Sequence, residues 1–184
     1  MNLHHLKIDR SWSLFLDRDG VINRRIVDDY VKTWDQFEFL PGVLDALKLF
    51  HQIFGKIIVV SNQQGVGKGL MAKMDVHSVH DRMMEEIRNA GGKIDAVFYS
   101  PHLQSDGSIM RKPNIGMALK TRIQFPEIRF KKSVMAGDSI SDMLFGKRLR
   151  MITVLISQDA ELARIHPKQI DYICPDLISL ANAL

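Results

Sequence analysis

Apolar residues along the chain follow two patterns, continuous runs and runs with helical spacing. Continuous runs rich in β-branched or aromatic residues are typical of strands that a parallel sheet buries on both faces. Five such runs occur, at residues 12–16, 56–60, 94–99, 133–136 and 151–156, and a short sixth strand is predicted at 172–173. Apolar residues at helical spacing predict helices over residues 41–55, 75–90, 113–123 and 175–184. Strands that alternate with helices predict an α/β fold with a Rossmann-like, doubly wound parallel sheet flanked by helices.

Two acids follow the first predicted strand directly. Asp17 and Asp19 are separated by one residue, and Gly20 behind them supplies the freedom to turn. The acids therefore stand at the carboxyl end of a strand, where open α/β sheets bind their ligands. Two carboxylates this close repel each other unless a cation lies between them or one of them carries a proton. Both remedies suit phosphoryl transfer, in which Asp17 attacks phosphorus and Asp19 serves as acid and base; an acidic turn without function is the alternative.

Polar side chains also follow the next three strands. Ser61 and Asn62 follow the second strand, where a hydroxyl and an amide can bind phosphate oxygens. Arg111 and Lys112 lie directly before a predicted helix, where cations oppose the helix dipole and therefore indicate an anionic partner. Asp138 follows the fourth strand and would complete an oxygen cage for Mg²⁺. Because the carboxyl ends of parallel strands meet at one edge, we expect these groups to meet around one ion and one phosphate group.

Three residues on predicted helices allow more than one interpretation. Asp142 follows Asp138 by four residues and either holds a neighbour such as Lys112 or caps the helix. His77 and His80 lie three apart, a spacing compatible with metal ligands. No acid or thiol stands at a matching spacing, so we expect both histidines at the surface.

Length and composition favour one soluble domain. The 184 residues, 46% of them hydrophobic and 25% charged, are enough for a single core spanning residues 1–184, with residues 1–11 as a short polar extension. No apolar run approaches the length of a membrane span, and residues 1–10 lack the apolar centre of a signal peptide. The one cysteine, Cys174, argues against an internal disulfide or a multi-thiolate zinc site. We therefore expect a cytoplasmic protein with no membrane partner.

The formal net charge of +4 invites comparison with nucleic-acid-binding proteins. The basic residues are scattered along the sequence, however, and none is interleaved with aromatic residues as a stacking platform requires. A small anionic substrate would benefit from the same charge. We expect a small phosphorylated substrate, no nucleic-acid partner, and a monomer.

Four segments together resemble a known family. The segments DRDGVIN, SNQQG, RKP and GDSISD, which begin at residues 17, 61, 111 and 137, resemble the four motifs of the haloacid dehalogenase superfamily of aspartyl-phosphate phosphatases. Their order and spacing are most similar to the small, capless D-glycero-D-manno-heptose 1,7-bisphosphate phosphatases and the related histidinol-phosphate phosphatases. The resemblance covers about residues 12–157. It implies a Mg²⁺-dependent sugar phosphatase; a histidinol-phosphate phosphatase and a catalytically silent phosphate-binding protein of the same fold are the alternatives.

Carried over position by position, the resemblance implies a role for each motif residue. Asp17 would be the nucleophile and a Mg²⁺ ligand, and Asp138 would complete the metal site. Asp19 would be the acid and base, and its backbone carbonyl would also bind the metal. Ser61 and Lys112 would hold the transferred phosphoryl group. The residues that would face the substrate come from the motifs and from a small flap after the first strand: Arg25, Asp28, Asn62, Gln63 and Arg111.

One loop departs from the family pattern. Many relatives hold a structural zinc ion before the third motif, with three cysteines and a histidine. In this sequence Ser100 and His102 stand where a cysteine and the histidine are expected, and Ser108 and Met110 replace the other two cysteines. Only His102 remains of the four ligands, so we expect no zinc. The loop shapes the substrate pocket in those relatives, so its change bears on which sugar is accepted.

Overall fold

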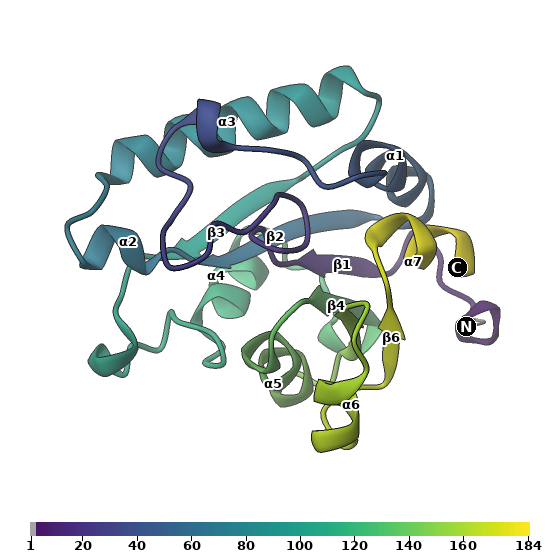
Figure 1. Cartoon of the computed structure of the whole chain (residues 1–184). Helices are drawn as coiled ribbons and strands as arrows, with labels where there is room; N and C mark the ends of the chain where they lie inside the picture. The colour runs from purple at the N-terminus through teal and green to yellow at the C-terminus, as the bar shows by residue number, and fades with distance from the viewer. Residues whose placement is uncertain (1–2) are drawn as a thin grey trace.

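The computed structural model describes residues 3–184, and its centre is a six-stranded sheet (Figure 1). The strands are β1 (Ser13–Leu16), β2 (Lys56–Asn62), β3 (Ala96–Ser100), β4 (Ser133–Gly137), β5 (Ile152–Ile156) and β6 (Tyr172–Cys174). They pair in the order β3-β2-β1-β4-β5-β6, and every neighbouring pair is parallel. The predicted doubly wound parallel sheet is confirmed.

Helices cover both faces of this sheet. They are α1 (Val43–Ile53), α2 (Gln64–Gly67), α3 (Lys73–Asn89), α4 (Gly116–Gln124), α5 (Ile140–Arg148), α6 (Glu161–Ile165) and α7 (Leu177–Ala183). The helices α1, α3 and α7 pack on one face, whereas α4 and α5 pack on the other (Figure 1). Within residues 3–184, none of the helices combines the length and the apolar character needed to cross a membrane.

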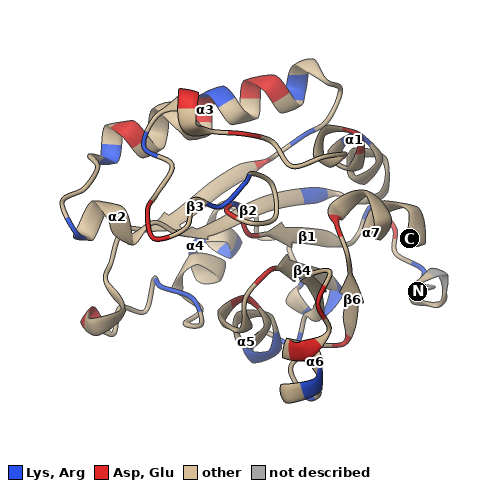
Figure 2. Ribbon diagram, viewed as in Figure 1, with Lys and Arg blue, Asp and Glu red and all other residues tan. Residues whose placement is uncertain are grey.

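The central strand β1 shows why the apolar runs are continuous. Leu14 and Leu16 belong to the core under α1, α3 and α7, whereas Phe15 belongs to the core under α4 and α5. Successive side chains of a strand point to opposite faces, so a strand with helices on both faces is apolar throughout. Charged residues accordingly lie on helices and loops, and Lys56 is the only one in the six strands of the described residues (Figure 2).

Some short stretches differ from the prediction. Helix α4 begins at Gly116, a few residues later than predicted, because Asn114 N–H donates to the Arg111 carbonyl at 2.8 Å and closes a turn first. Leu3, which the prediction placed in a polar extension, is buried, and its N–H donates to the Ala183 carbonyl at 3.0 Å. The described part of that extension therefore packs against α7. Helices α2 and α6 have four and five residues, too few for a helical period to appear in the sequence.

The predicted flap is the loop of residues 21–42, which joins β1 to α1. Its two ends are held together where Leu40 N–H donates to the Ile22 carbonyl at 3.0 Å. Its middle contains a short 3₁₀ helix, Trp34–Gln36. Arg82 of α3 lies over the Trp34 ring, with its guanidinium carbon 5.0 Å from the ring centroid. The flap is therefore a loop that rests against α3.

Candidate active site

The predicted site residues gather at the carboxyl edge of β2, β1 and β4. The chain leaves β1 for β2 and β3 on one side and returns to β4 on the other, so this edge is a topological switch point, where such sheets bind ligands. A cleft of about 430 Å³ opens there. The predicted residues that line it are Asp17, Asp19, Arg25, Asp28, Ser61, Asn62, Arg111 and Lys112.

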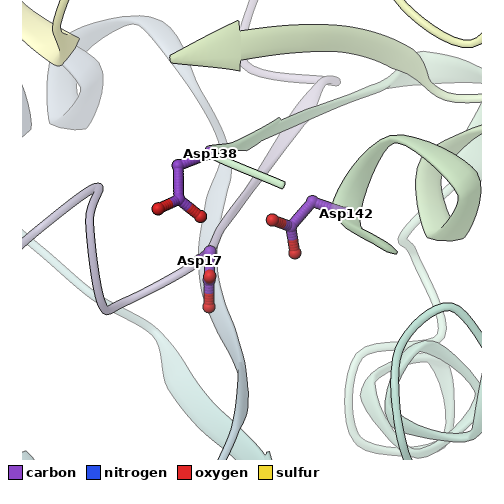
Figure 3. A group of neighbouring side chains, drawn as sticks. All are labelled: Asp17, Asp138 and Asp142. Atoms are coloured by element: carbon purple, nitrogen blue, oxygen red, sulfur yellow. The ribbon is translucent and has the colours of Figure 1, made fainter. Parts of the chain in front are cut away.

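Three carboxylates lie together at this edge (Figure 3). Asp17 follows β1, Asp138 follows β4 and Asp142 lies in the first turn of α5, and each offers an oxygen within 4.8 Å of the other two. Asp17 N–H donates to the Ala136 carbonyl at 3.0 Å, which extends the β1–β4 pairing and brings the first two acids side by side. Gly20 has a φ of +87°, and a Cβ there would collide with the Asp138 carboxylate, so the approach of the two loops requires glycine.

Lys112 lies between two of these acids. Its Nζ is 2.8 Å from Asp17 Oδ1 and 2.6 Å from Asp142 Oδ1, and it donates to the Val60 carbonyl at 2.6 Å. The residue is only 3% exposed. Burial alone would lower the pKa of Lys112, but Asp142 and Asp17 outweigh it, and the pKa is raised. The ammonium group is therefore held charged beside the proposed nucleophile.

Asp142 fulfils both of the roles left open by the sequence. Its Oδ1 pairs with Lys112, and its Oδ2 accepts hydrogen bonds from the Ser139 N–H at 3.1 Å and the Ser139 hydroxyl at 2.6 Å. The second set of contacts caps α5. Because both of its oxygens are engaged, Asp142 is a partner of the lysine, and Asp17 and Asp138 are left to hold a cation.

The loop that carries Lys112 is fixed by Asn62 at the end of β2. Asn62 Nδ2 donates to the Lys112 carbonyl at 3.1 Å, and Lys112 N–H donates to Asn62 Oδ1 at 3.0 Å. Asn62 lines the cleft as predicted, but its amide binds protein backbone. These two bonds hold the loop against the end of β2, so the Lys112 side chain reaches the sheet edge where Asp17 lies.

The carboxylate of Asp19 is held by donors on several sides. Arg18 Nη2 lies 2.9 Å from both of its oxygens, Asn23 Nδ2 donates to Oδ1 at 3.0 Å, and Gln63 Nε2 donates to Oδ2 at 2.8 Å. Burial would raise the pKa of Asp19, but the Arg18 guanidinium and the amide donors outweigh it, and the pKa is lowered. Gln63 also donates to the Ser61 hydroxyl at 2.7 Å, so it links two predicted catalytic residues.

The two remaining acids fit a divalent cation. Burial and the neighbouring carboxylates together raise the pKa of Asp17 to about 6 and that of Asp138 to about 7, although Lys112 and Arg25 act in the opposite direction. Such a pair ionises readily only with positive charge between its members. Hard cations such as Mg²⁺ are bound by one or two carboxylates together with other oxygens. Asp17, Asp138 and the Asp19 carbonyl are the groups that would hold the ion.

A side chain of the flap already brings positive charge to that position. Arg25 Nη2 donates to Asp138 Oδ1 at 2.9 Å and to the Asp19 carbonyl at 3.3 Å. These are two of the three groups predicted as metal ligands. Arg25 is therefore in contact with the cation site itself, and its guanidinium supports the interpretation that this cluster binds a cation.

Known proteins share this arrangement. The family described as polynucleotide kinase 3 phosphatase matches residues 14–172, which include all four motifs. The chain belongs to this family. It is a phosphatase with a haloacid dehalogenase-type fold, as the resemblance implied.

Individual relatives of the phosphatase carry more specific names. The D-glycero-alpha-D-manno-heptose-1,7-bisphosphate 7-phosphatase of Mycobacterium bovis is 45% identical over 132 residues, covering 72% of this chain and 70% of the relative. The corresponding beta-type enzyme of Pasteurella multocida is 30% identical over 179 residues, covering 94% and 96%. The crystal structure of the D,D-heptose 1,7-bisphosphate phosphatase from B. bronchiseptica, complexed with magnesium and phosphate, has a TM-score of 0.80 at 28% identity. That similarity covers 93% of this chain and 96% of the other.

Two residues are more deeply buried than the sequence predicted. Gln63 does not face the cleft, because it is 1% exposed and lies beneath Asp19 and Ser61. His80 is not at the surface, because it is 4% exposed and its Nε2 lies 3.0 Å from Arg18 Nη1. His77 is exposed as expected. The burial of His80 could have been predicted from the apolar spacing of α3, because His80 lies four residues after buried Val76 on the same helical face.

Replacement of Arg25 should strengthen metal binding by the phosphatase. Arg25→Gln removes a guanidinium that competes for Asp138 and the Asp19 carbonyl, so we expect Mg²⁺ to bind the substrate-free variant about two- to fivefold more tightly. Isothermal titration calorimetry measures this directly. Arg24→Gln is the matched control, because Arg24 pairs with exposed Glu38 instead. Equal or weaker Mg²⁺ binding by Arg25→Gln would contradict the interpretation.

The loop that binds zinc in relatives is held here by hydrogen bonds. Ser100 Oγ accepts from His102 N–H at 3.4 Å, Ser108 Oγ accepts from Met110 N–H at 3.2 Å, and Asn114 Nδ2 donates to the Ser108 carbonyl at 3.0 Å. The first two bonds lie within the two ends of the loop, and the third joins the loop to the turn before α4. Two hydroxyl groups and the thioether of Met110 thus stand where the family pattern has thiolates, and zinc sites in proteins are built from thiolate, imidazole and carboxylate groups instead.

Elemental analysis should therefore find far less than one zinc per chain. Protein purified without chelators and analysed by mass spectrometry of metals provides the measurement. Added zinc should not raise the melting temperature at micromolar concentration, because His102 has no thiolate partners in the loop. One tightly bound zinc per chain would overturn the interpretation of the loop.

His80 should make the stability of the phosphatase depend on pH. Burial lowers the pKa of His80 to about 3, from an ordinary value near 6.5. Between these values the unfolded chain binds a proton that the folded chain does not, so its contribution to stability is present above pH 6.5 and is lost as the pH falls. Urea unfolding at pH 7 and 5.5 should show a decrease that is smaller for His80→Gln than for the wild type, by about 1 kcal/mol. Equal decreases would contradict this assignment.

Proposed function

We propose that this phosphatase removes the phosphate at position 7 of D-glycero-manno-heptose 1,7-bisphosphate through an aspartyl-phosphate intermediate. The observation that carries the proposal is the contact of Asp17 with Lys112 beside Asp138, at the edge of the sheet where all four motifs meet. The names of relatives at 30–45% identity support the substrate.

The chemistry would run in two steps. One carboxylate oxygen of Asp17 attacks phosphorus, and the bond from phosphorus to the sugar oxygen breaks. Asp19, which the substrate-free site favours as a carboxylate because its pKa is lowered, must enter this step protonated, and it donates its proton to the departing oxygen. Water then attacks the aspartyl phosphate, Asp19 takes up a proton from that water, and the Asp17 carboxylate is restored. Lys112 and Ser61 hold the phosphoryl oxygens throughout. When bound, Mg²⁺ supplies positive charge that neutralises the phosphoryl oxygens as the bond breaks.

The cleft offers further cations for a second phosphate. Arg111 and Lys68 line it together with Lys112, and Arg111 also borders a neighbouring hollow of about 240 Å³. The Lys68 ammonium lies 5.4 Å from the ring centroid of Tyr30, another lining residue. A bisphosphate would place one phosphate at Asp17 and the other among these cations, which would favour it over a monophosphate.

A substrate panel tests the proposal. Phosphate release with Mg²⁺ is measured for both anomers of the heptose bisphosphate, heptose 7-phosphate, histidinol phosphate and an oligonucleotide with a 3′-phosphate. We expect the highest kcat/KM for the heptose bisphosphate, with the alpha anomer preferred because the relative at 45% identity carries that name. The product should retain its phosphate at position 1. A higher kcat/KM for histidinol phosphate or for the oligonucleotide would overturn the assignment.

A further inference from the structure

A buried chain of contacts leads from α3 to the first motif. His80 of α3 contacts Arg18, and Arg18 contacts Asp19. We propose that His80 is a positioning residue for catalysis, which fixes the orientation of the Asp19 carboxylate through the guanidinium of Arg18. The inference rests on the proposed function of Asp19 as acid and base.

Arg18 has no contact with solvent that could orient it. Its side chain is 0% exposed and is the largest fully buried side chain among the described residues. Nη2 lies 2.9 Å from both oxygens of Asp19 and 3.3 Å from Gln63 Oε1, and Nη1 lies 3.0 Å from His80 Nε2. Its Nε has no hydrogen-bond partner. Three side chains therefore determine how the guanidinium is turned, and His80 is the only one of them on a helix of the scaffold.

The direction of the His80 contact follows from chemistry. A guanidinium donates hydrogen bonds and accepts none, so His80 Nε2 is the acceptor and the imidazole proton is on Nδ1. Burial keeps the imidazole neutral, with a pKa lowered to about 3, so the acceptor is available at any pH at which the protein works. His80 is also fixed in place, because Val76, Val79 and Met83 of the same helix face are fully buried.

Loss of His80 would release the guanidinium. Arg18 Nη1 would become a buried charged donor without an acceptor, which costs free energy until the group turns or water enters. Asp19 would then lose the present geometry of its two 2.9 Å contacts with Arg18 and would be held by the amides of Asn23 and Gln63 alone. Small displacements of a reacting group lower the rate of the chemical step strongly, whereas binding of the phosphate by Lys112 and Ser61 would be unaffected. The loss should therefore appear in kcat and not in KM.

The kinetic test compares three variants. His80→Leu should lower kcat about 10- to 100-fold and leave KM within about twofold. His80→Gln supplies an amide oxygen near the position of Nε2 and should restore kcat to within a few fold of wild type. His77→Leu is the matched control, because His77 is exposed on the same helix and contacts the hydroxyl and the ring of Tyr99 instead of Arg18, so both constants should stay unchanged. A raised KM with unchanged kcat, or no rescue by glutamine, would overturn the proposal.

A double variant separates positioning from general damage to the fold. In an Asp19→Asn background the added His80→Leu substitution should have no further effect on kcat, because the group that His80 positions is already lost. A full additional decrease would show that His80 acts on the fold or on another residue. Circular dichroism melting of each variant establishes that the compared proteins are folded.

Nuclear magnetic resonance tests the geometry without any substrate. Long-range ¹H–¹⁵N spectra of the wild-type protein should show His80 as the neutral tautomer with its proton on Nδ1 from pH 5.5 to 8. A proton on Nε2 would overturn the proposal whatever the enzyme hydrolyses. Failure of the heptose bisphosphate as substrate would instead leave this result intact and bear on the proposed function alone, since the kinetic comparison can use any phosphate ester that the enzyme cleaves.

Discussion

Asp17→Asn should lower phosphate release by about 10⁴-fold or more at saturating Mg²⁺ and substrate. The amide of asparagine has the shape of the carboxylate but is no nucleophile, and the aspartyl phosphate cannot form. Lys112 keeps its contact with Asp142 in the variant, so the surrounding structure should be retained. Discontinuous phosphate assays on the best substrate of the panel give the measurement.

The control for this prediction is Asp45→Asn, on the exposed side of α1. It changes the same residue type and the same net charge far from the motifs, and it should retain wild-type kcat. Circular dichroism should show both variants folded. Retention of more than about 1% of wild-type activity by Asp17→Asn would contradict the nucleophile assignment, because acid–base assistance alone contributes about 10²- to 10⁴-fold.

Lys112→Met should damage both stability and activity. The substitution leaves Asp17 and Asp142 as buried carboxylates without their cation, so the free energy of unfolding at pH 7 should fall by about 3 kcal/mol. We expect kcat to fall about 10³-fold, because in the proposed mechanism the cation also holds the phosphoryl oxygens. Urea unfolding and phosphate release measure the two effects.

The pH dependence of this variant provides a sharper check. Without the lysine, which lowers the pKa of Asp17, that pKa rises further, and Asp17 takes up a proton in the folded state as the pH falls. The difference in stability from wild type should therefore be smaller at pH 5 than at pH 7. Lys147→Met is the control, because Lys147 forms a partly exposed pair with Asp171 and its loss should cost less than about 1 kcal/mol. A cost below about 1 kcal/mol for Lys112→Met would contradict a stabilising role for the ion pairs of Lys112 with Asp17 and Asp142.

The sheet and the acids could be predicted from the sequence because they depend on local patterns. A strand covered on both faces must be apolar throughout, and parallel strands end at a common edge. Asp17, Ser61 and Asp138 follow such runs directly, so their meeting needed no knowledge of helix packing. In the flap, by contrast, the residues at positions 30–34 are mostly β-branched or aromatic but have no partner strand, and this part of the chain is a loop with a short 3₁₀ helix.

The residues that lie behind the acids are placed by tertiary packing, which local patterns in the sequence do not indicate. Arg18 stands between two acids in the sequence, and its neighbours do not indicate whether its side chain is exposed or buried. It is buried because the fold places α3 over it. Gln63 directly follows β2, but its backbone turns into α2 and its amide lies beneath Asp19. His80 was the exception, since its position on the apolar face of α3 is visible in the spacing of the neighbouring residues.

Cations gather in a way that the linear sequence hides. A hollow of about 630 Å³ is lined by two apolar side chains, Phe130 and Leu149, and by six basic ones: Arg122, Arg129, Lys131, Lys132, Arg148 and Arg150. They come from the end of α4, the turn before β4 and the end of α5, three segments that are separate in the sequence. Pairs of basic residues therefore appeared scattered, although the fold brings them to one place.

The replacement of thiolates in the loop before α4 has a chemical consequence for the whole molecule. Cys174 is the one cysteine of this chain, it is 2% exposed, and burial raises the pKa of its thiol to about 11. Almost no thiolate is present at neutral pH, and thiolate is the form that peroxide and alkylating agents attack. Hydrolysis by this enzyme should thus persist under oxidative stress that would strip metal from a cysteine-ligated loop.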